Sequence, residues 1–122
     1  MYIKKVMKSG DEADLILSDG NHECLVFCHP CSLNEGDELD GMIDVFNTDD
    51  IVKSDEETIF IEHKPSVSYY NHWIVAEVEN VSKGKLKVGN FHFQVFRLPG
   101  DIKNGDRVKF NAHRLDLQLH VV

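Results

Sequence analysis

The chain has 122 residues, of which 42% are hydrophobic and 28% charged, and its formal net charge is −8. This size and composition fit one compact globular unit or two very small ones, and they exclude a disordered or membrane-spanning chain. No apolar run approaches the roughly 20 residues of a membrane-spanning helix, and the start of the chain, residues 1–6, lacks the apolar core of a signal peptide. Three cysteines, an odd number, without a secretory signal indicate a reducing compartment, so we expect a cytoplasmic protein.

The first half of the chain shows the alternation of a small β structure. Period-2 patterns predict strands at Leu15–Leu17 and Cys24–Phe27, joined by the turn at residues 19–21. A proline loop and the pair Gly36-Asp37 follow, and they lead into a further predicted strand, Met42–Phe46. Residues 47–52 have the composition of one short helical turn.

A connector runs from about residue 53 to about residue 72 and contains one predicted strand at residues 58–62. The next strand is expected at Ile74–Val81. A hairpin follows at residues 83–95, turning at Gly89-Asn90, because both residues tolerate the positive φ of a tight turn. After a second proline loop, the pair Gly105-Asp106 leads into a strand at Val108–Ala112.

The two halves contain a similar segment. Residues 19–39 align without a gap to residues 88–108 with seven identities, in the order Gly-Asn, Val-Phe, Pro and Gly-Asp. The shared positions are largely turn residues, whose identity is set by backbone geometry. This indicates an internal duplication.

The order of hairpin, proline loop, Gly-Asp and strand resembles OB-fold and SH3-like barrels, including those of translation factors, in which a strand such as residues 105–110 is common. The resemblance implies a mostly β protein made of small, curved barrels. We therefore predict two tandem barrels that pack on each other, an acidic one at residues 1–62 and a mildly basic one at residues 63–122.

Three cysteines and two histidines cluster within ten residues, and Cys24, Cys28, His29 and Cys31 form a candidate zinc site. Two observations favour the opposite interpretation. A complementary ligand pair is missing elsewhere, and the aligned loop of the second copy has Phe93, Arg97 and Gly100 in place of the cysteines. We expect no cofactor and a buried, structural Cys24, and a small zinc-binding module stays open as an alternative. Redox chemistry at Cys28 and Cys31 is disfavoured because such thiols are activated at the N-terminus of a helix, and the segment that follows here is too short and is interrupted by a glycine.

Barrels of this kind often bind single-stranded nucleic acid through a basic groove with aromatic stacking platforms. The second copy carries suitable residues, whereas the net charge of the whole chain repels a polyanion. Nucleic-acid binding by the second barrel is therefore an alternative function. Its candidate residues are Lys83, Lys85, Lys87, His92, Phe96 and Arg97.

The distribution of charge supplies the functional hypothesis. Residues 1–61 have four basic against fifteen acidic side chains, a net −11, whereas residues 62–122 have nine against six, a net +3. Residues 9–52 contain twelve acidic residues and neither lysine nor arginine. A surface of one sign costs self-repulsion, so it indicates a surface kept for a basic protein partner, with simple solubility as the alternative.

We accordingly expect a non-enzymatic binding module. By charge analogy, it would occupy the cationic cleft of a nucleic-acid-binding or nucleic-acid-cleaving protein, as inhibitors and immunity proteins do. The predicted contact is an acidic ridge at the proline loop, made of Glu35, Asp37, Glu38 and Asp40.

Overall fold

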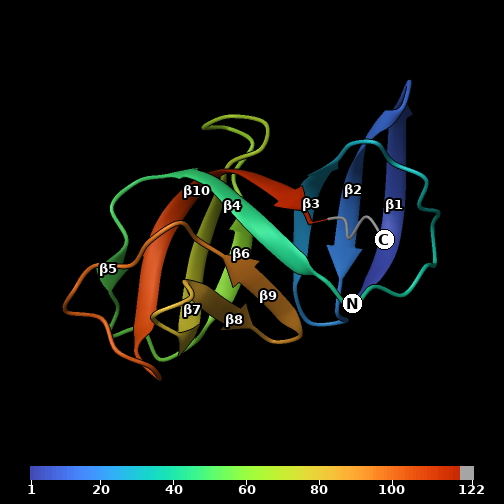
Figure 1. Cartoon of the computed structure of the whole chain (residues 1–122). Coiled ribbons are helices and arrows are strands. Elements are labelled where there is room, and N and C mark those ends of the chain that lie inside the picture. Colours follow the sequence, from blue (N-terminus) through green and yellow to red (C-terminus); the bar gives the residue numbers. More distant parts are fainter. Residues whose placement is uncertain (119–122) are drawn as a thin grey trace.

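The computed structural model describes residues 1–118, and its ten elements are all strands, which confirms the prediction of a mostly β protein. Figure 1 shows β1, β2 and β3 on one side, the other strands on the opposite side, and β4 and β10 running between the two. The strands are β1 (Tyr2–Ser9), β2 (Glu12–Ser18), β3 (Glu23–Cys28), β4 (Met42–Thr48), β5 (Val52–Lys53), β6 (Phe60–His63), β7 (His72–Asn80), β8 (Lys85–Val88), β9 (Phe91–Gln94) and β10 (Arg107–Leu117).

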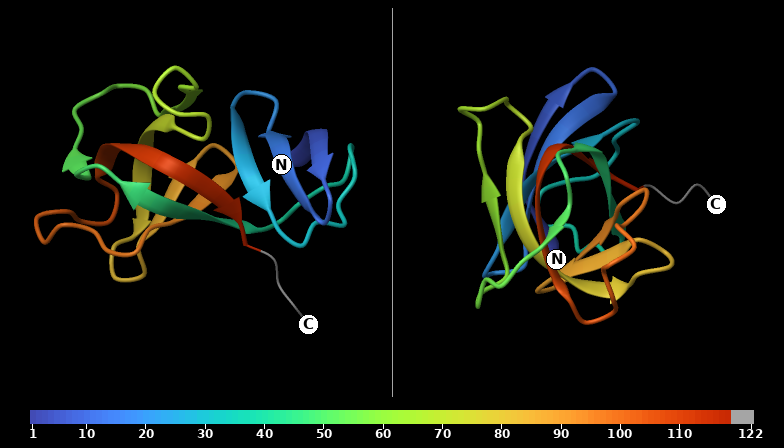
Figure 2. Two further views of the ribbon diagram at one scale, coloured as in Figure 1. Left: turned by 90° about the horizontal axis from the view of Figure 1, so that it is seen from above. Right: turned by 90° about the vertical axis from the view of Figure 1, so that its left-hand side faces the viewer.

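One closed barrel forms from β4, β9, β8, β7 and β10, because β10 pairs both with β4 and with β7. The other pairs around the barrel are antiparallel except β4 with β9, which is parallel. Strands β1, β2 and β3 form an antiparallel sheet that joins β10 through the parallel pair Phe27 and Asp116. Strand β6 extends the barrel beside β7 and is an edge of the sheet, as is β1 (Figure 2).

The two tandem barrels of the prediction are not seen in the described residues. Strand β4, from the first copy, closes the barrel of the second, and the boundary expected between residues 62 and 63 lies inside β6. The reason lies in β10, whose eleven residues are long enough to pair with β7 along Arg107–Ala112 and with β4 along Arg114–Leu117. Division of the chain into two folding units stays a prediction.

The buried side chains form one continuous hydrophobic cluster rather than two. The inward face of the β1–β3 sheet, including Leu15 and Val26, belongs to the same cluster as Phe91, Phe93 and Phe110 of the barrel. Burial of Cys24 and of both phenylalanines of β9 confirms the expected core positions. Because small barrels alone bury little apolar surface, a shared core stabilises both parts.

The two similar segments make matching backbone hydrogen bonds. In each proline loop, a glycine with positive φ donates its N–H to a strand carbonyl at 2.8 Å, from Gly36 to Ile3 and from Gly105 to Val78. The aspartate that follows each glycine accepts an N–H within the loop through Oδ2 at 2.9 Å, Asp37 in one loop and Asp106 in the other. The short helical turn predicted at residues 47–52 is wrong, because Asn47 has a φ of +51° and residues 52–53 form β5.

The two hairpin turns, at residues 19–22 and 89–90, touch each other. The carboxylate of Asp19 accepts backbone N–H groups from Asn21, His22 and, across the contact, Asn90 at 3.1 Å. Burial opposes the charged form of Asp19, but these N–H donors together outweigh burial and lower its pKa to about 2.

This depressed pKa predicts a pH window for Asp19. Its contribution of about 2 kcal/mol is present above pH 3.8, the ordinary value, and is lost as the pH falls through about 2. Urea unfolding between pH 5 and pH 2 should therefore show a smaller loss of stability for Asp19→Asn than for the unchanged protein. Equal losses would contradict this role.

Candidate binding surfaces

The proline loop after β3 carries the predicted acidic ridge and follows the outer edge of β1, where Ile3 N–H donates to the carbonyl of Asp37 at 2.9 Å (Figure 1). Glu38 and Asp40 are exposed on this loop. Glu35 is exposed too, and its Oε1 accepts the N–H of Val6 at 3.3 Å. Asp37 is half-buried and holds the loop through its bond from the N–H of Asn34, so its first role is structural.

The surroundings of Asp40 differ from those of the other ridge residues. It shares a hollow of about 490 Å³ with Lys85 and His92, which the sequence had assigned to a different surface. The positive charge of Lys85 at this hollow offsets the charge of Asp40. Of the four predicted contact residues, Glu35 and Glu38 therefore offer carboxylates that are both exposed and outside this hollow.

The residues predicted to bind nucleic acid fall into two groups. On β7–β9, Lys87 is paired in register with Glu77, and His92 Nδ1 lies 3.0 Å from the carboxylate of Glu79. These acidic neighbours reduce the positive field along Lys83, Lys85 and Lys87. Beyond β9, Phe96 is 101% exposed, and Arg97 beside it is exposed as well.

The cysteines are buried in the core of the β1–β3 sheet and the adjoining loop. Among residues 1–118, no group of three or more His, Cys, Asp or Glu side chains is placed to hold a metal ion. Cys24, Cys28 and Cys31 are all buried, whereas His29 points outward, with its Nδ1 3.9 Å from Asp11. Within the described residues, the zinc-binding alternative is therefore not supported by a cluster of ligand side chains.

Burial also governs the reactivity of these thiols. Burial raises the pKa of Cys24, with the carboxylates of Asp19 and Glu23 adding to it. Burial and a hydrogen bond to Cys31 raise the pKa of Cys28 to about 12. Since the thiolate is the nucleophile and the metal ligand, both thiols are poorly suited to nucleophilic chemistry at neutral pH.

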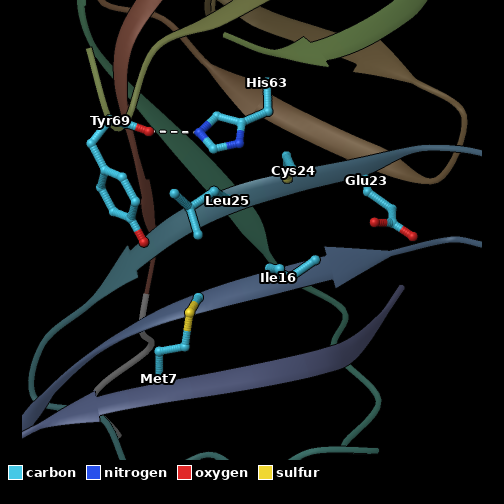
Figure 3. Close-up of a pocket in the computed structure, with 7 residues that line it drawn as sticks. All are labelled: Met7, Ile16, Glu23, Cys24, Leu25, His63 and Tyr69. Atoms are coloured by element: carbon cyan, nitrogen blue, oxygen red, sulfur yellow. Dashed lines mark hydrogen bonds between the residues drawn. The ribbon is translucent and has the colours of Figure 1, made fainter. Parts of the chain in front are cut away.

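A separate hollow that sequence reasoning missed opens between the β1–β3 sheet and the segment after β6. Its volume is about 210 Å³, and Figure 3 shows Met7, Ile16 and Leu25 on the sheet with His63 and Tyr69 across from them. Cys24 and Glu23 complete the lining. We call this hollow the β3 groove. It was missed because its walls come from segments about forty residues apart.

Two histidines fix the wall of the β3 groove. His72 is fully buried, its Nε2 accepts the N–H of Leu25 at 3.0 Å, and its Nδ1 lies 2.9 Å from the carbonyl of Tyr70, so Nδ1 carries the proton. Burial lowers the pKa of His72 to about 4, and its neighbour His63 acts in the same direction. His63 stacks on it at a ring distance of 4.9 Å and bonds through Nε2 to the carbonyl of Tyr69 at 2.6 Å.

Two tyrosines connect the groove to an acidic residue of β2. Tyr70 donates its hydroxyl to Asp14 at 2.8 Å, and burial together with Asp14 raises the pKa of Tyr70 to about 12. The Tyr69 ring lies 4.8 Å from that of Tyr70, and its hydroxyl pKa is also raised, by burial and then by Asp14. The groove is thus apolar at its base and has aromatic and acidic side chains at its border, a combination suited to binding a ligand with both apolar and cationic parts.

Comparisons of the chain with known protein families, with curated proteins and with solved structures find no match. Within the described residues, the structure has no helix long and apolar enough to cross a membrane. The class of protein is therefore argued from the surfaces alone.

Proposed function

We propose that this chain is a non-enzymatic binding module that engages a basic protein partner through its acidic surface, in the manner of an inhibitor or immunity-type protein. The observation that carries the proposal is the exposure of the acidic residues. Of the twelve in residues 9–52, eight are exposed, in a stretch without lysine or arginine. Such a field steers a cationic partner and accelerates association.

The ridge on the proline loop supports this proposal because the loop is anchored. Its backbone is hydrogen-bonded to Ile3 of β1 and to Met1 just before it, so Glu35 and Glu38 project from an ordered segment. An ordered carboxylate loses less side-chain and backbone entropy on binding than one on a disordered tail. Asp37 also maintains the loop by accepting the N–H of Asn34, and it stays one of the four predicted contact residues.

Neutralising the ridge should slow association with a basic partner. The Glu35→Gln/Glu38→Gln variant removes two charges and keeps an acceptor oxygen for Val6 N–H, so its urea midpoint should stay unchanged. We expect an association rate about three- to tenfold lower at low salt and a smaller difference at high salt. Partners are first captured with the unchanged protein and identified, and the rates are then measured by stopped flow.

The matched control is Glu56→Gln/Glu57→Gln, which removes the same charge from two exposed residues outside the acidic stretch 9–52. The control should associate at nearly the rate of the unchanged protein. Partner association that ignores both salt and the ridge substitutions would show that the acidic surface only confers solubility.

Binding of single-stranded nucleic acid through the second copy is the other candidate, favoured by one observation. Phe96 is fully exposed beside Arg97, an arrangement suited to stacking on a base. The carboxylates of Glu77 and Glu79 lie beside Lys87 and His92 and argue against binding of a polyanion on this surface. A labelled oligonucleotide titrated at two salt concentrations separates this candidate from the first.

A further inference from the structure

The β3 groove combines an aliphatic base with aromatic walls. Leu25 is buried beneath it, Ile16 and Met7 are half-buried, and Tyr69 is 49% exposed above them. Figure 3 shows the Tyr69 and His63 side chains on the side of the groove opposite the strands. A straight aliphatic chain of a few methylenes has the dimensions for this surface.

Acidic groups border the groove on two sides. Glu23 lines it directly, and Asp14 lies within hydrogen-bonding reach of Tyr70 and raises the pKa of both tyrosines. Glu23 already holds a cation, since Lys4 Nζ lies 2.6 Å from its Oε2. Both side chains of that pair are about half exposed, so the pair is weak and a second cation can replace Lys4 at small cost.

The same face of the molecule shows how this chain holds a cation of its own. The guanidinium of Arg114 lies 5.2 Å from the ring centroids of both Phe27 and Phe46, and it bonds to Asp116 at 2.6 and 2.9 Å. The row of rings continues from Phe27 to Tyr70, at 6.5 Å, and on to Tyr69. Arg114 thus lies on aromatic rings and pairs with a carboxylate, and the groove likewise combines an aromatic ring with a carboxylate.

We propose that the β3 groove receives one lysine or arginine side chain of the basic protein partner, an inference that rests on the proposed function. The aliphatic stem lies on Leu25 and Ile16 with its start against the Tyr69 ring, and the cation pairs with Glu23, at the opposite end of the groove, in place of Lys4 (Figure 3). Lys5 lies opposite Ile16 in the strand register and is exposed, so it borders the groove without filling it.

The test uses the full chain and two small probes, N-acetyl-arginine methylamide and its uncharged counterpart N-acetyl-norleucine methylamide. Amide chemical shifts of the ¹⁵N-labelled protein are followed during titration. We expect saturable shifts at Ile16, Leu25 and Tyr69 with the arginine probe, and binding about threefold or more weaker with the norleucine probe. Equal binding of both probes, or shifts that do not saturate, would overturn the inference.

Two variants and one control locate the binding. Tyr69→Ala should weaken both probes about twofold or more, because it removes apolar area beside the stem. It leaves the backbone bond to His63 available, because that bond uses the Tyr69 carbonyl. Glu23→Gln, a change at an exposed position, should weaken the arginine probe and leave the norleucine probe unaffected. Val67→Ala, in the same loop and 68% exposed, should change neither. Probe binding that is insensitive to both Tyr69→Ala and Glu23→Gln would place the cation elsewhere and reject the groove.

Failure of this inference is distinguishable from failure of the proposed function. If a basic partner binds and depends on Glu35 and Glu38, while the arginine probe leaves the groove unshifted, the acidic surface stands and the groove does not. If association with basic proteins ignores salt and the ridge, the proposed function fails, and with it the premise of the groove.

Discussion

Acidification from pH 7 to pH 4 should destabilise the folded protein by about 3 kcal/mol through His72 alone. In the fold, His72 is neutral and has a pKa of about 4. In the unfolded chain, it takes up a proton near its ordinary value of 6.5. The unfolded state therefore binds more protons between these two values, so stability is full above pH 6.5 and is lost as the pH falls toward 4.

The physical cause is the pair of bonds that His72 makes. Its Nε2 must stay unprotonated to accept the N–H of Leu25, and a charge there would be buried beside His63. This contact joins β3 to β7, so protonation weakens the junction between the β1–β3 sheet and the barrel. Urea unfolding at several pH values measures the loss, and the titration of the His72 ring proton by NMR gives its pKa directly.

The His72→Gln variant separates this residue from other titrating groups. A glutamine amide keeps an acceptor and a donor and does not titrate. The variant should therefore avoid most of the loss of about 3 kcal/mol that His72 causes between pH 6.5 and pH 4. A His72→Gln protein with the same pH dependence as the unchanged one would exclude this role.

Replacing Gly89 by alanine should cost about 3 kcal/mol or more, whereas the same change at Gly20 should cost about 1 kcal/mol. The two glycines occupy aligned positions in the two copies, and both have a positive φ, +57° at Gly89 and +93° at Gly20. A methyl group on Gly20 meets nothing within 4 Å. On Gly89, it would overlap the carboxylate of Asp19 and the ring of His22.

The difference between the two variants measures the contact between the hairpin turns. Both glycines have a positive φ, so backbone strain contributes to both costs, and the excess cost at Gly89 reports the overlap that displaces Asp19 from the Asn90 N–H. Combining Gly89→Ala with Asp19→Ala should recover part of the overlap cost, which makes the effects of the two changes non-additive. Equal costs for Gly89→Ala and Gly20→Ala would mean that the turns are not in contact.

The contacts of His72 also shape the β3 groove. His72 bonds to Leu25 beneath the groove, and His63 stacks on His72 while it lines the groove. The binding surface is therefore supported by the same contacts that hold the two parts of the fold together. A groove variant should always be compared with the stability of its fold at the pH of the binding assay.

The pattern of residues alone predicted most strands, the hairpin turns at residues 19–21 and 89–90, and a few core positions. Alternation in Phe91–Gln94 predicted its buried phenylalanines, and the glycine turns were predicted because positive φ is a local property of the chain. Strand β1 was not predicted. A bulge between Ile3 and Lys5 interrupts its alternation, so the period-2 signal fails there.

Which strand pairs with which was decided only in the tertiary structure. Alternation shows that a strand has a buried face but does not name its neighbour, and β4 and β10 each pair across the two copies. In place of the two predicted barrels, the described residues form one barrel and a three-stranded sheet over a shared core. The β3 groove has the same origin, because Leu25 and Tyr69 meet only when β3 and the segment after β6 are brought together by His72. The charge of a segment and the residues that favour a turn are local properties of the sequence. The pairing of distant strands depends instead on how the whole chain buries its apolar faces.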